Sequence, residues 1–546
     1  MKRDWGPSHQ DMAPPFQKRP SWFWNILGWY LLALIAHGAI DKGGPDPLIW
    51  SLKALVAGWL TVWFVQAVRD GRIPISWLAS LISTTPAEEV VVDANDVGTP
   101  GEAVRAQVAR LGGGAYLGVS RRGGWMLADP EHAVMVLGPP RSGKTSAVMI
   151  PALMACSGAA VSTSTKPDVM DATVIARSEV GQAWLFDPSA DERRLPEGVR
   201  RLCWSPVAAA SSWDEALVMA RAMTACTRVG SGTTNENHWT ERAAALLAPL
   251  LYAAQLTGRP IGEVLRWTLR QDLAPAMDAL ADGGSEIAAD VLVGIQKTDA
   301  RERSSIFSAT AGVLAAYNAD AVRANAKNPN FDPDRFAAST DTIYITAPEH
   351  KQALCAPLIV GLLEQIRHAV YQRAATRAID GPAMLWALDE LANIAPIHDL
   401  PALVSQAGGQ KLQVMIGLQD LSQARTRWGA DAADGFLSLF QTKLILNGIA
   451  DTRSLEAISI ALGEYDRDTI NHSLGRSDPQ EWFSTTTHSD TVGYQTQRQR
   501  VLTPGEIARL PDGQGLLLQG ADWQLLGLTP WHRTEPWKTI AGAHGS

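Results

Sequence analysis

The chain has 546 residues, of which 46% are hydrophobic and 19% charged, and its formal net charge is −8. At roughly 150 residues per domain, this length predicts about three or four folded units and excludes a lone small binding module. Because the net charge is negative, the protein surface as a whole is not expected to bind nucleic acid. Any contact with DNA therefore requires a local basic surface or a pore formed on assembly.

Residues 1–79 are predicted to form an N-terminal membrane anchor. Two apolar stretches, 22–40 and 48–68, are each long enough to cross about 30 Å of hydrocarbon as a transmembrane helix. Basic residues precede the first stretch and follow the second, whereas the short loop between them carries only Lys42. This distribution predicts a multi-pass protein of the cell membrane with both termini in the cytoplasm. A cleaved signal peptide is the alternative for the first stretch, but a second span follows it directly.

Residues 80–111 are predicted to be a polar linker, and an α/β body follows it. Short apolar runs predict strands at 133–137, 159–163, 183–186, 342–346, 384–388, 412–417 and 443–446. They alternate with longer amphipathic stretches, which is typical of a mainly parallel sheet with helices on both faces. Between the third and fourth runs the strand signal disappears and Ala/Leu-rich stretches take over. We therefore predict an inserted all-α domain at 207–295.

The first predicted strand leads into Gly-Pro-Pro-Arg-Ser-Gly-Lys-Thr at 138–145, which fits the phosphate-binding pattern G-x-x-x-x-G-K-[ST]. The alternative is an ordinary glycine-rich turn, but the strand before the motif and the helix-compatible segment after it are the context that a phosphate loop requires. In such a loop, backbone N–H groups surround the phosphates, Lys144 places a positive charge on the β and γ oxygens, and Thr145 can ligate Mg²⁺. The predicted cofactors are ATP and Mg²⁺. The predicted nucleotide-binding residues are Gly138, Pro139, Pro140, Arg141, Ser142, Gly143, Lys144, Thr145 and Ser146.

Because of this motif we predict a nucleotide-binding domain in two parts. Residues 112–206 form the first part, and residues 296–546 form the second part together with the C-terminal strands. The run at 384–388 ends in Asp389 and Glu390. We expect this run to be a strand neighbouring the phosphate loop, with Asp389 on the magnesium side and Glu390 as the general base that polarises water. Standing alone, the pair also fits a buried strand that ends in an acidic loop.

Two further segments follow the acidic pair. The apolar stretch 412–418 leads to Gln419, whose neutral amide can hydrogen-bond the γ-phosphate or its water; an exposed polar residue at a strand end is an equal alternative. The 36 residues from 465 to 500 are rich in Ser, Thr, Gln, Asp and Arg, and we expect a mobile loop there. Strand-like runs at 515–518 and 523–526 follow it.

Several motifs in one order resemble those of the type IV secretion coupling proteins, the TraG/TraD-like conjugative ATPases, and in particular a form found in actinobacteria. The resemblance extends over residues 112–530 and includes the two N-terminal spans. The segments that carry it are the loop at 138–145, Lys166-Pro-Asp168, Asn237-His-Trp239, 328–332 (NPNFD), 385–397 (LWALDELANIAPI) and 416–429 (IGLQDLSQARTRWG).

This resemblance implies a membrane-anchored, hexameric ATPase of RecA-like fold with an all-helical domain facing the cytoplasm. Such a protein recruits a relaxase bound to DNA and drives single-stranded DNA, with its protein pilot, or protein effectors into the channel proteins of the secretion system. Family members can respond to both single- and double-stranded DNA. Carried over by motif, Lys144 and Thr145 match nucleotide-binding positions, Asp389 and Glu390 match the magnesium and catalytic acids, and Gln419 matches a catalytic glutamine.

One departure concerns the arginine that, in relatives, lies between the acidic pair and the glutamine and reaches a neighbouring subunit. The segment 404–411 (VSQAGGQK) contains no arginine. Lys411 can supply charge without the forked geometry of a guanidinium, and Arg425 and Arg427 are alternative candidates. The basic residues Arg301, Arg303, Arg323 and Lys327 fit either a central pore or a solvated helix face.

Two other functions remain open at the level of sequence. A septal-type translocase of double-stranded DNA shares the anchor, the phosphate loop and the hexamer, although no recognisable winged-helix DNA reader follows Arg509. A receptor or scaffold in which nucleotide binding only orders the assembly is the second alternative, and the missing arginine leaves it open.

Overall fold

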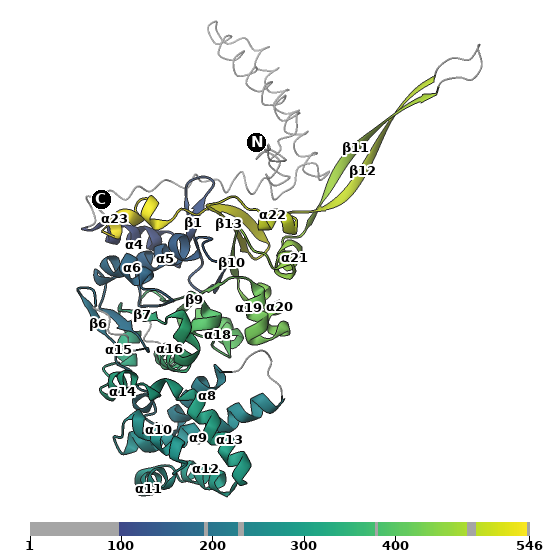
Figure 1. The fold of residues 1–546 in the computed structure, drawn as a ribbon. Helices are drawn as coiled ribbons and strands as arrows, with labels where there is room; N and C mark the ends of the chain where they lie inside the picture. Colours follow the sequence, from purple (N-terminus) through teal and green to yellow (C-terminus); the bar gives the residue numbers. More distant parts are fainter. Residues whose placement is uncertain (1–97, 190–194, 228–233, 377–380, 478–486, 543–546) are drawn as a thin grey trace. The chain divides into compact units, whose positions relative to one another are not determined.

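The computed structural model describes residues 98–189, 195–227, 234–376, 381–477 and 487–542 (Figure 1). The chain divides into two compact units, residues 1–90 and 91–546, and all described residues belong to the second. The predicted transmembrane helices at 22–40 and 48–68 lie outside the described residues.

A twelve-stranded sheet forms the centre of the second unit, in the order β2-β1-β14-β13-β10-β3-β9-β8-β4-β7-β5-β6. From β10 to β6 neighbouring strands run parallel, whereas β13, β14, β1 and β2 continue the sheet with antiparallel pairings. The strands are β1 (Tyr116–Ser120), β2 (Trp125–Leu127), β3 (Val134–Leu137), β4 (Ala160–Ser164), β5 (Ala183–Phe186), β6 (Val199–Arg201), β7 (Thr342–Thr346), β8 (Met384–Leu388), β9 (Leu412–Leu418), β10 (Thr442–Leu446), β13 (Gln514–Gln519) and β14 (Asp522–Gly527).

Both faces of this sheet are buried. Along β3, Val134 and Val136 belong to one hydrophobic cluster, whereas Met135 and Leu137 belong to another on the opposite face. The helices that connect and cover the strands are α4 (Pro100–Arg110), α5 (Ile150–Ala155), α6 (Asp168–Ser178), α16 (Gln352–Ala375), α17 (Leu391–Ile394), α18 (Leu400–Ala407), α19 (Leu421–Trp428), α20 (Ala430–Leu439), α21 (Thr452–Ala461), α22 (Pro504–Ala508) and α23 (Trp537–Ile540).

All seven strands predicted from apolar runs are present, within one residue at either end, as β3, β4, β5, β7, β8, β9 and β10. Their residues are almost all buried, which explains why an uninterrupted apolar run is the correct signal for them. The two C-terminal runs form β13 and β14. The short strands β1, β2 and β6 were not predicted.

Helix α4 lies inside the segment predicted as a linker. Thr99 and Glu102 form a capping box at its start, in which each side chain bonds the backbone N–H of the other residue. Arg105 then forms an ion pair with Glu179, at 2.9 Å between Nη2 and Oε2, so α4 is attached to the end of α6. The end of the predicted linker is therefore ordered helix.

Between β6 and β7 the described chain is helical. The helices are α7 (Pro206–Ala209), α8 (Trp213–Ala225), α9 (Thr234–Leu256), α10 (Ile261–Arg270), α11 (Ala274–Gly283), α12 (Glu286–Lys297), α13 (Ala300–Val313), α14 (Asp320–Lys327) and α15 (Pro333–Ala337). Helix α9 contacts each of α10, α11, α12 and α13, and these helices form one group in Figure 1. The predicted end of the all-α domain at residue 295 falls within α12, and three more helices follow.

The described residues contain one helix long and apolar enough to cross a membrane, Glu349–Ala375. Of its most apolar window, 67% is buried inside the fold. Its C-terminal part, α16, packs against α8, α15 and α17.

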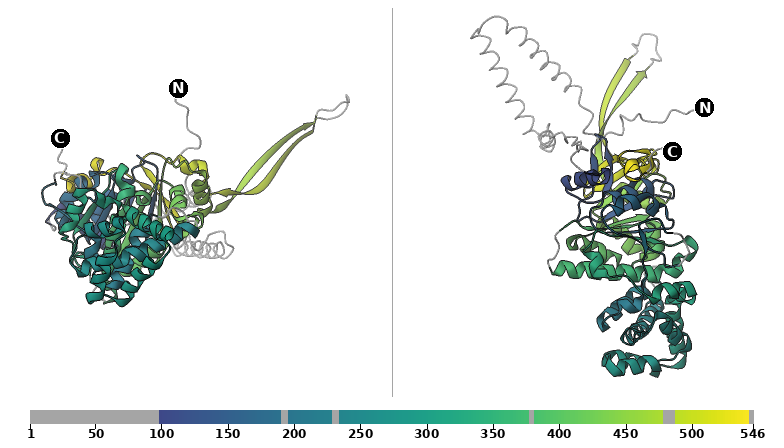
Figure 2. Two further views of the ribbon diagram at one scale, coloured as in Figure 1. Left: turned by 60° about the horizontal axis from the view of Figure 1, so that its bottom comes forward. Right: turned by 90° about the vertical axis from the view of Figure 1, so that its left-hand side faces the viewer.

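The segment predicted as a mobile loop contains a long β-hairpin. Strands β11 (Glu464–Ser477) and β12 (Thr487–Arg500) pair in antiparallel register from Glu464 with Arg500 to Ser477 with Thr487, and they form a separate two-stranded sheet (Figure 2). The prediction was wrong because it relied on aliphatic residues, whereas backbone pairing alone defines these strands. At the base, Arg500 forms a bidentate ion pair with Glu456 of α21, with N···O distances of 2.8 and 2.6 Å.

Candidate nucleotide-binding site

The loop at 138–143 connects β3 to a short π-helical turn, Lys144–Met149. Gly143 has a φ of 97°, which favours glycine. Gly138 is required for space, because a Cβ there would lie 2.5 Å from Ser142 Oγ and 2.9 Å from Leu446 Cβ. The loop therefore requires glycine at 143 for its backbone conformation and at 138 for lack of space.

Lys144 folds back over the loop and is only 5% exposed. Its ammonium group donates to the carbonyl oxygen of Gly138 and, at 3.3 Å, to that of Pro139. These partners are neutral carbonyl groups, so the positive charge is held at the loop and can interact with an anion. Pro140 and Arg141 are exposed on the same loop.

Ser142 provides an independent indication of a ligand. Its hydroxyl oxygen is buried and has no hydrogen-bond partner in the part of the chain that the structure describes. Buried hydroxyl groups are normally hydrogen-bonded, so an unsatisfied one in this loop fits a phosphate oxygen.

Asp389 contacts the phosphate loop directly although it lies 244 residues further along the chain. Its Oδ2 accepts a hydrogen bond from Thr145 Oγ1, and its Oδ1 accepts one from the backbone N–H of Glu390 at 3.0 Å. The carboxylate is only 6% exposed. A buried carboxylate beside a hydroxyl is a suitable pair of oxygen ligands for Mg²⁺.

The expectation that the acidic strand neighbours the phosphate-loop strand was wrong. Strand β9 lies between β3 and β8 and pairs with both. Asp389 can nevertheless reach Thr145 because residue 417 of β9 is glycine. A Cβ on Gly417 would lie 2.6 Å from Asp389 Oδ1.

Glu390 follows in the left-handed conformation, with φ 51° and ψ 40°. Burial raises the pKa of its carboxyl group, and the neighbouring Asp389 raises this pKa further. Lys144 and hydrogen bonds from Gln419 and Asn393 act in the opposite direction, without cancelling the rise. Glu390 is therefore easier to protonate than an ordinary glutamate.

Gln419 lies at the carboxyl end of β9 and bonds Glu390 through its side chain. Its backbone N–H donates to Gln423 Oε1 at 2.9 Å. Sequence motifs separated by hundreds of residues thus meet where β3, β9 and β8 end, as expected for a ligand site of a parallel sheet. Gly417 and Asn393 were not predicted from the sequence, although a glycine inside an apolar run is a known sign of close approach by another group.

The helices after these two strands are joined to one another. Arg427 Nε donates to the carbonyl oxygen of Ala392 at 3.1 Å, and Trp428 Nε1 donates to that of Ile397 at 2.7 Å. Burial lowers the pKa of Arg427. The turn that carries Glu390 and the helix that follows Gln419 therefore share direct contacts.

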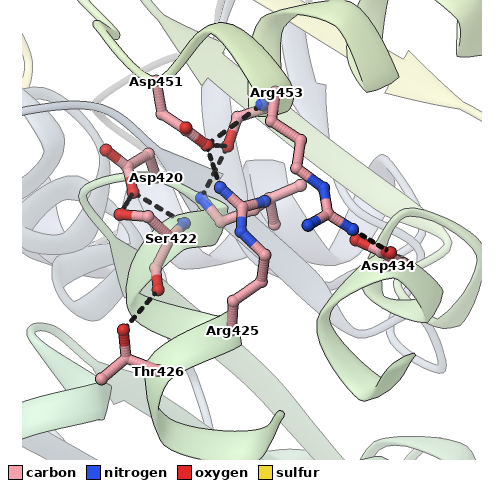
Figure 3. A network of polar contacts seen from close by, with 9 residues as sticks. Asp420, Ser422, Arg425, Thr426, Asp434, Asp451 and Arg453 are labelled. Atoms are coloured by element: carbon pink, nitrogen blue, oxygen red, sulfur yellow. Dashed lines mark hydrogen bonds and ion pairs between the residues drawn. The ribbon is translucent and has the colours of Figure 1, made fainter. Parts of the chain in front are cut away.

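Figure 3 shows that Arg425, one of the candidate arginines, points towards Asp451. The two side chains form an ion pair, and the same carboxylate accepts from the backbone N–H and hydroxyl of Ser454. Arg453 is paired with Asp434 at 2.6 Å. Arg425 and Arg427 thus both have partners within their own chain, whereas Lys411 is exposed at the opposite end of β9.

Two of the four basic residues considered for a pore, Arg303 and Arg323, have local partners. Arg303 donates to the carbonyl oxygen of Gln296 at 2.8 Å, and Arg323 pairs with Asp320 and the carbonyl oxygen of Tyr317. These contacts agree with a solvated helix face.

A phosphate loop on a mainly parallel sheet, with an acidic pair at the end of a nearby strand, defines a P-loop nucleotide-binding protein of RecA-like fold. The model of the family described as "Type IV secretory system Conjugative DNA transfer" matches residues 99–522. The chain belongs to this family. The predicted relationship to coupling proteins and the predicted RecA-like fold with a mainly parallel sheet are therefore confirmed.

The similar proteins agree with this assignment. The chain is 22% identical over 362 residues to the protein VirD4 of Rhizobium rhizogenes, which covers 63% of this chain and 51% of VirD4. The chain thus spans about half the length of the curated relatives it matches. A structure of the unbound bacterial conjugative coupling protein TrwB has a TM-score of 0.56 at 17% identity, covering 78% of this chain and 91% of TrwB. TrwB in complex with ADP and Mg²⁺ gives 0.53 at 18% identity, covering 78% and 92%.

Proposed function

We propose that this protein is a membrane-anchored ATPase that couples ATP hydrolysis to the transfer of a DNA–protein substrate through a type IV secretion channel. The observation that carries the ATPase activity is the hydrogen bond from Thr145 of the phosphate loop to Asp389. It supports the proposal because it joins the two predicted magnesium ligands from separate parts of the chain. Family membership supports the role in conjugative DNA transfer.

The residues present fit a nucleoside triphosphate with Mg²⁺. The backbone of 138–145 and the Lys144 ammonium group would hold the phosphates, and Thr145 and Asp389 would hold the metal ion. The buried Ser142 hydroxyl offers a further hydrogen bond to a phosphate oxygen. When bound, Mg²⁺ neutralises charge that develops on the γ-phosphate. The likeness to TrwB, solved with ADP and Mg²⁺ and with an ATP analogue, supports the same ligands here.

In this proposal Glu390 orients the attacking water and accepts its proton. The pKa of Glu390 is raised and so lies closer to the operating pH, which makes the carboxylate a stronger base. Asn393 donates a hydrogen bond to Glu390 Oε2 at 3.4 Å, and the Gln419 side chain also interacts with Glu390, so both neighbours help to position the base before the reaction. Lys144 stabilises the negative charge of the phosphates from within the loop.

The proposal includes assembly and location. We propose a homo-hexamer that receives a relaxase–DNA complex, contacts single- or double-stranded DNA and docks on the channel proteins of the secretion system. The two apolar stretches at 22–40 and 48–68 would place it in the cell membrane with both termini in the cytoplasm.

Two substitutions test the ATPase assignment. Lys144→Ala removes the positive charge that would bind the phosphates. Glu390→Gln removes the base while keeping the shape of the side chain. We expect each to reduce phosphate release by the purified full-length protein at least about 100-fold and to abolish conjugative transfer in cells. Glu390→Gln should still bind ATP.

The matched control is Glu131→Gln, which alters an exposed acid outside the site. It should leave both phosphate release and transfer at the wild-type level. Full transfer by either site variant, at wild-type amounts of protein in the membrane fraction, would contradict the motor function. Nucleotide binding without turnover in the wild type would instead favour a nucleotide-gated scaffold.

A further inference from the structure

The peptide group between Asp389 and Glu390 is fixed on both sides. Its N–H donates to Asp389 Oδ1 at 3.0 Å, within the same residue pair. Its carbonyl oxygen accepts a hydrogen bond from Thr163 Oγ1 of β4 at 2.8 Å. The second contact comes from a different strand, 226 residues away in the sequence.

Thr163 is placed for this contact by the register of the sheet. Strand β4 pairs with β8 in parallel, and the last pair is Thr163 with Leu388. Asp389 is therefore the first residue beyond the pairing, where the chain leaves the sheet. Thr163 is 0% exposed, so water cannot replace its hydroxyl group. Ser164, the next residue, points its hydroxyl elsewhere and bonds Asp168 at 3.3 Å.

The conformation of Glu390 requires such support. A left-handed conformation is unfavourable for a residue with a Cβ and persists where surrounding contacts enforce it. The orientation of the 389–390 peptide determines where both acidic side chains point. A hydroxyl in a fully buried strand is costly unless it is hydrogen-bonded, and valine would fill the same space without that requirement.

We propose that Thr163 is a positioning residue for the acidic pair: its hydroxyl holds the peptide that directs Asp389 towards the phosphate loop and Glu390 into its left-handed turn. This inference rests on the proposed ATPase function for its kinetic consequence, but its structural consequence is independent of turnover. Thr163 makes no contact with substrate in this scheme and acts through Asp389 and Glu390.

The test compares Thr163→Val, which removes the hydroxyl and keeps the shape, with Thr163→Ser, which keeps the hydroxyl and removes a methyl group. In the full-length protein we expect Thr163→Val to lower kcat about tenfold, the effect of one lost hydrogen bond, and to leave the affinity for ATP without Mg²⁺ within about twofold. Thr163→Ser should retain at least about half of the wild-type kcat. Experimental structures of both variants should show the left-handed Glu390 turn kept with serine and lost with valine.

The proposal would be overturned by an unchanged kcat in Thr163→Val, or by equal losses in the two variants, which would point to packing. A loss of affinity for ATP without Mg²⁺ that matches the loss of kcat would also overturn it, since the phosphate loop would then be the part disturbed. If the wild-type protein shows no turnover, the proposed function fails while Thr163 is still tested. In that case an intact left-handed turn in the valine variant overturns the positioning role, and its loss supports it.

Discussion

Gly417 lies on β9, Asp389 directly follows the adjacent strand β8, and the missing side chain of the glycine leaves the space that the aspartate occupies. A Cβ on Gly417 would lie 2.6 Å from Asp389 Oδ1 and 3.2 Å from Met149 Cε. The crossing of β9 by the Asp389 side chain is what joins β8 to the phosphate loop. The geometry of the candidate site thus depends on a residue that has no functional group.

Gly417→Ala is therefore expected to displace Asp389 from Thr145. We expect ATP hydrolysis to fall about 100-fold, because a shift of about 1 Å in a catalytic group has effects of this size. Steady-state phosphate release by the full-length protein measures it. The matched control is Gly435→Ala in α20, where an added Cβ would meet no atom within 4 Å. Equal activities of the two variants would contradict the steric role of Gly417.

Glu390 provides a prediction on pH and stability. Because its pKa is raised in the folded protein, the native state binds the proton more tightly than the unfolded chain. Its contribution favours folding below the unfolded pKa of about 4.3 and becomes unfavourable as the pH rises through the folded pKa. Glu390→Gln removes the unfavourable contribution of the ionised carboxylate to folding. The variant should have a higher melting temperature than the wild type at pH 7.5, without nucleotide.

The difference in melting temperature should shrink towards pH 4, where Glu390 of the wild type is protonated. Thermal unfolding followed by circular dichroism at several pH values measures it. The control is Glu506→Gln at the start of α22, where glutamine can keep the capping box but lacks the negative charge that stabilises a helix N-terminus, so this variant should instead be slightly less stable at neutral pH. A Glu390→Gln variant less stable than the wild type at pH 7.5 would contradict the direction of the pKa shift.

The parallel strands could be predicted because burial on both faces imposes continuous apolar runs. The phosphate loop and the acidic pair could be predicted for a related reason, since each is a local motif at the end of such a run. The order of the strands could not, because it is decided by tertiary packing. The contributions of Gly417 and Thr163 depend on that order, and neither carries a motif.

Helix α4 and the hairpin β11–β12 are two of the local structures that were missed, and for a related reason. Helix α4 has a complete capping signal, Thr99 followed by Glu102, but its composition is polar and the surrounding residues indicate turns. The hairpin β11–β12 has no continuous apolar run, and its strands are defined by pairing with each other. In both cases the prediction relied on hydrophobic pattern where capping or backbone pairing determined the structure.

Arg177 is predicted to be a major contributor to the stability of the sheet. It is 0% exposed and joins three segments: its Nε donates to Thr342 Oγ1 at 2.7 Å, and its Nη2 donates to the carbonyl oxygens of Gly158 at 2.6 Å and Thr340 at 3.0 Å. Arg177→Met would leave these acceptors buried and unpaired. We expect a loss of about 3–5 kcal/mol in the free energy of unfolding.

Chemical denaturation of the purified protein measures this loss. Arg453→Met is the matched control, because Arg453 pairs with Asp434 on the surface, where both side chains are more than half exposed. Such a pair contributes at most about 1 kcal/mol. Similar denaturation midpoints for the two variants would show that the buried guanidinium of Arg177 contributes no more to stability than a surface ion pair.

The hairpin should be removable without loss of the nucleotide site. Its strands pair with each other and not with the central sheet, and Glu464 lies directly opposite Arg500 at its base. Replacing residues 465–499 by Asn-Gly would close this base with a two-residue turn and keep the ion pair between Arg500 and Glu456. We expect ATP affinity and hydrolysis within about twofold of the wild type, since no hydrogen bond or ion pair joins the described part of the deleted segment to the residues of the site. A shortened protein that folds, judged by an unchanged melting temperature, but no longer binds ATP would show that the hairpin contributes to the site.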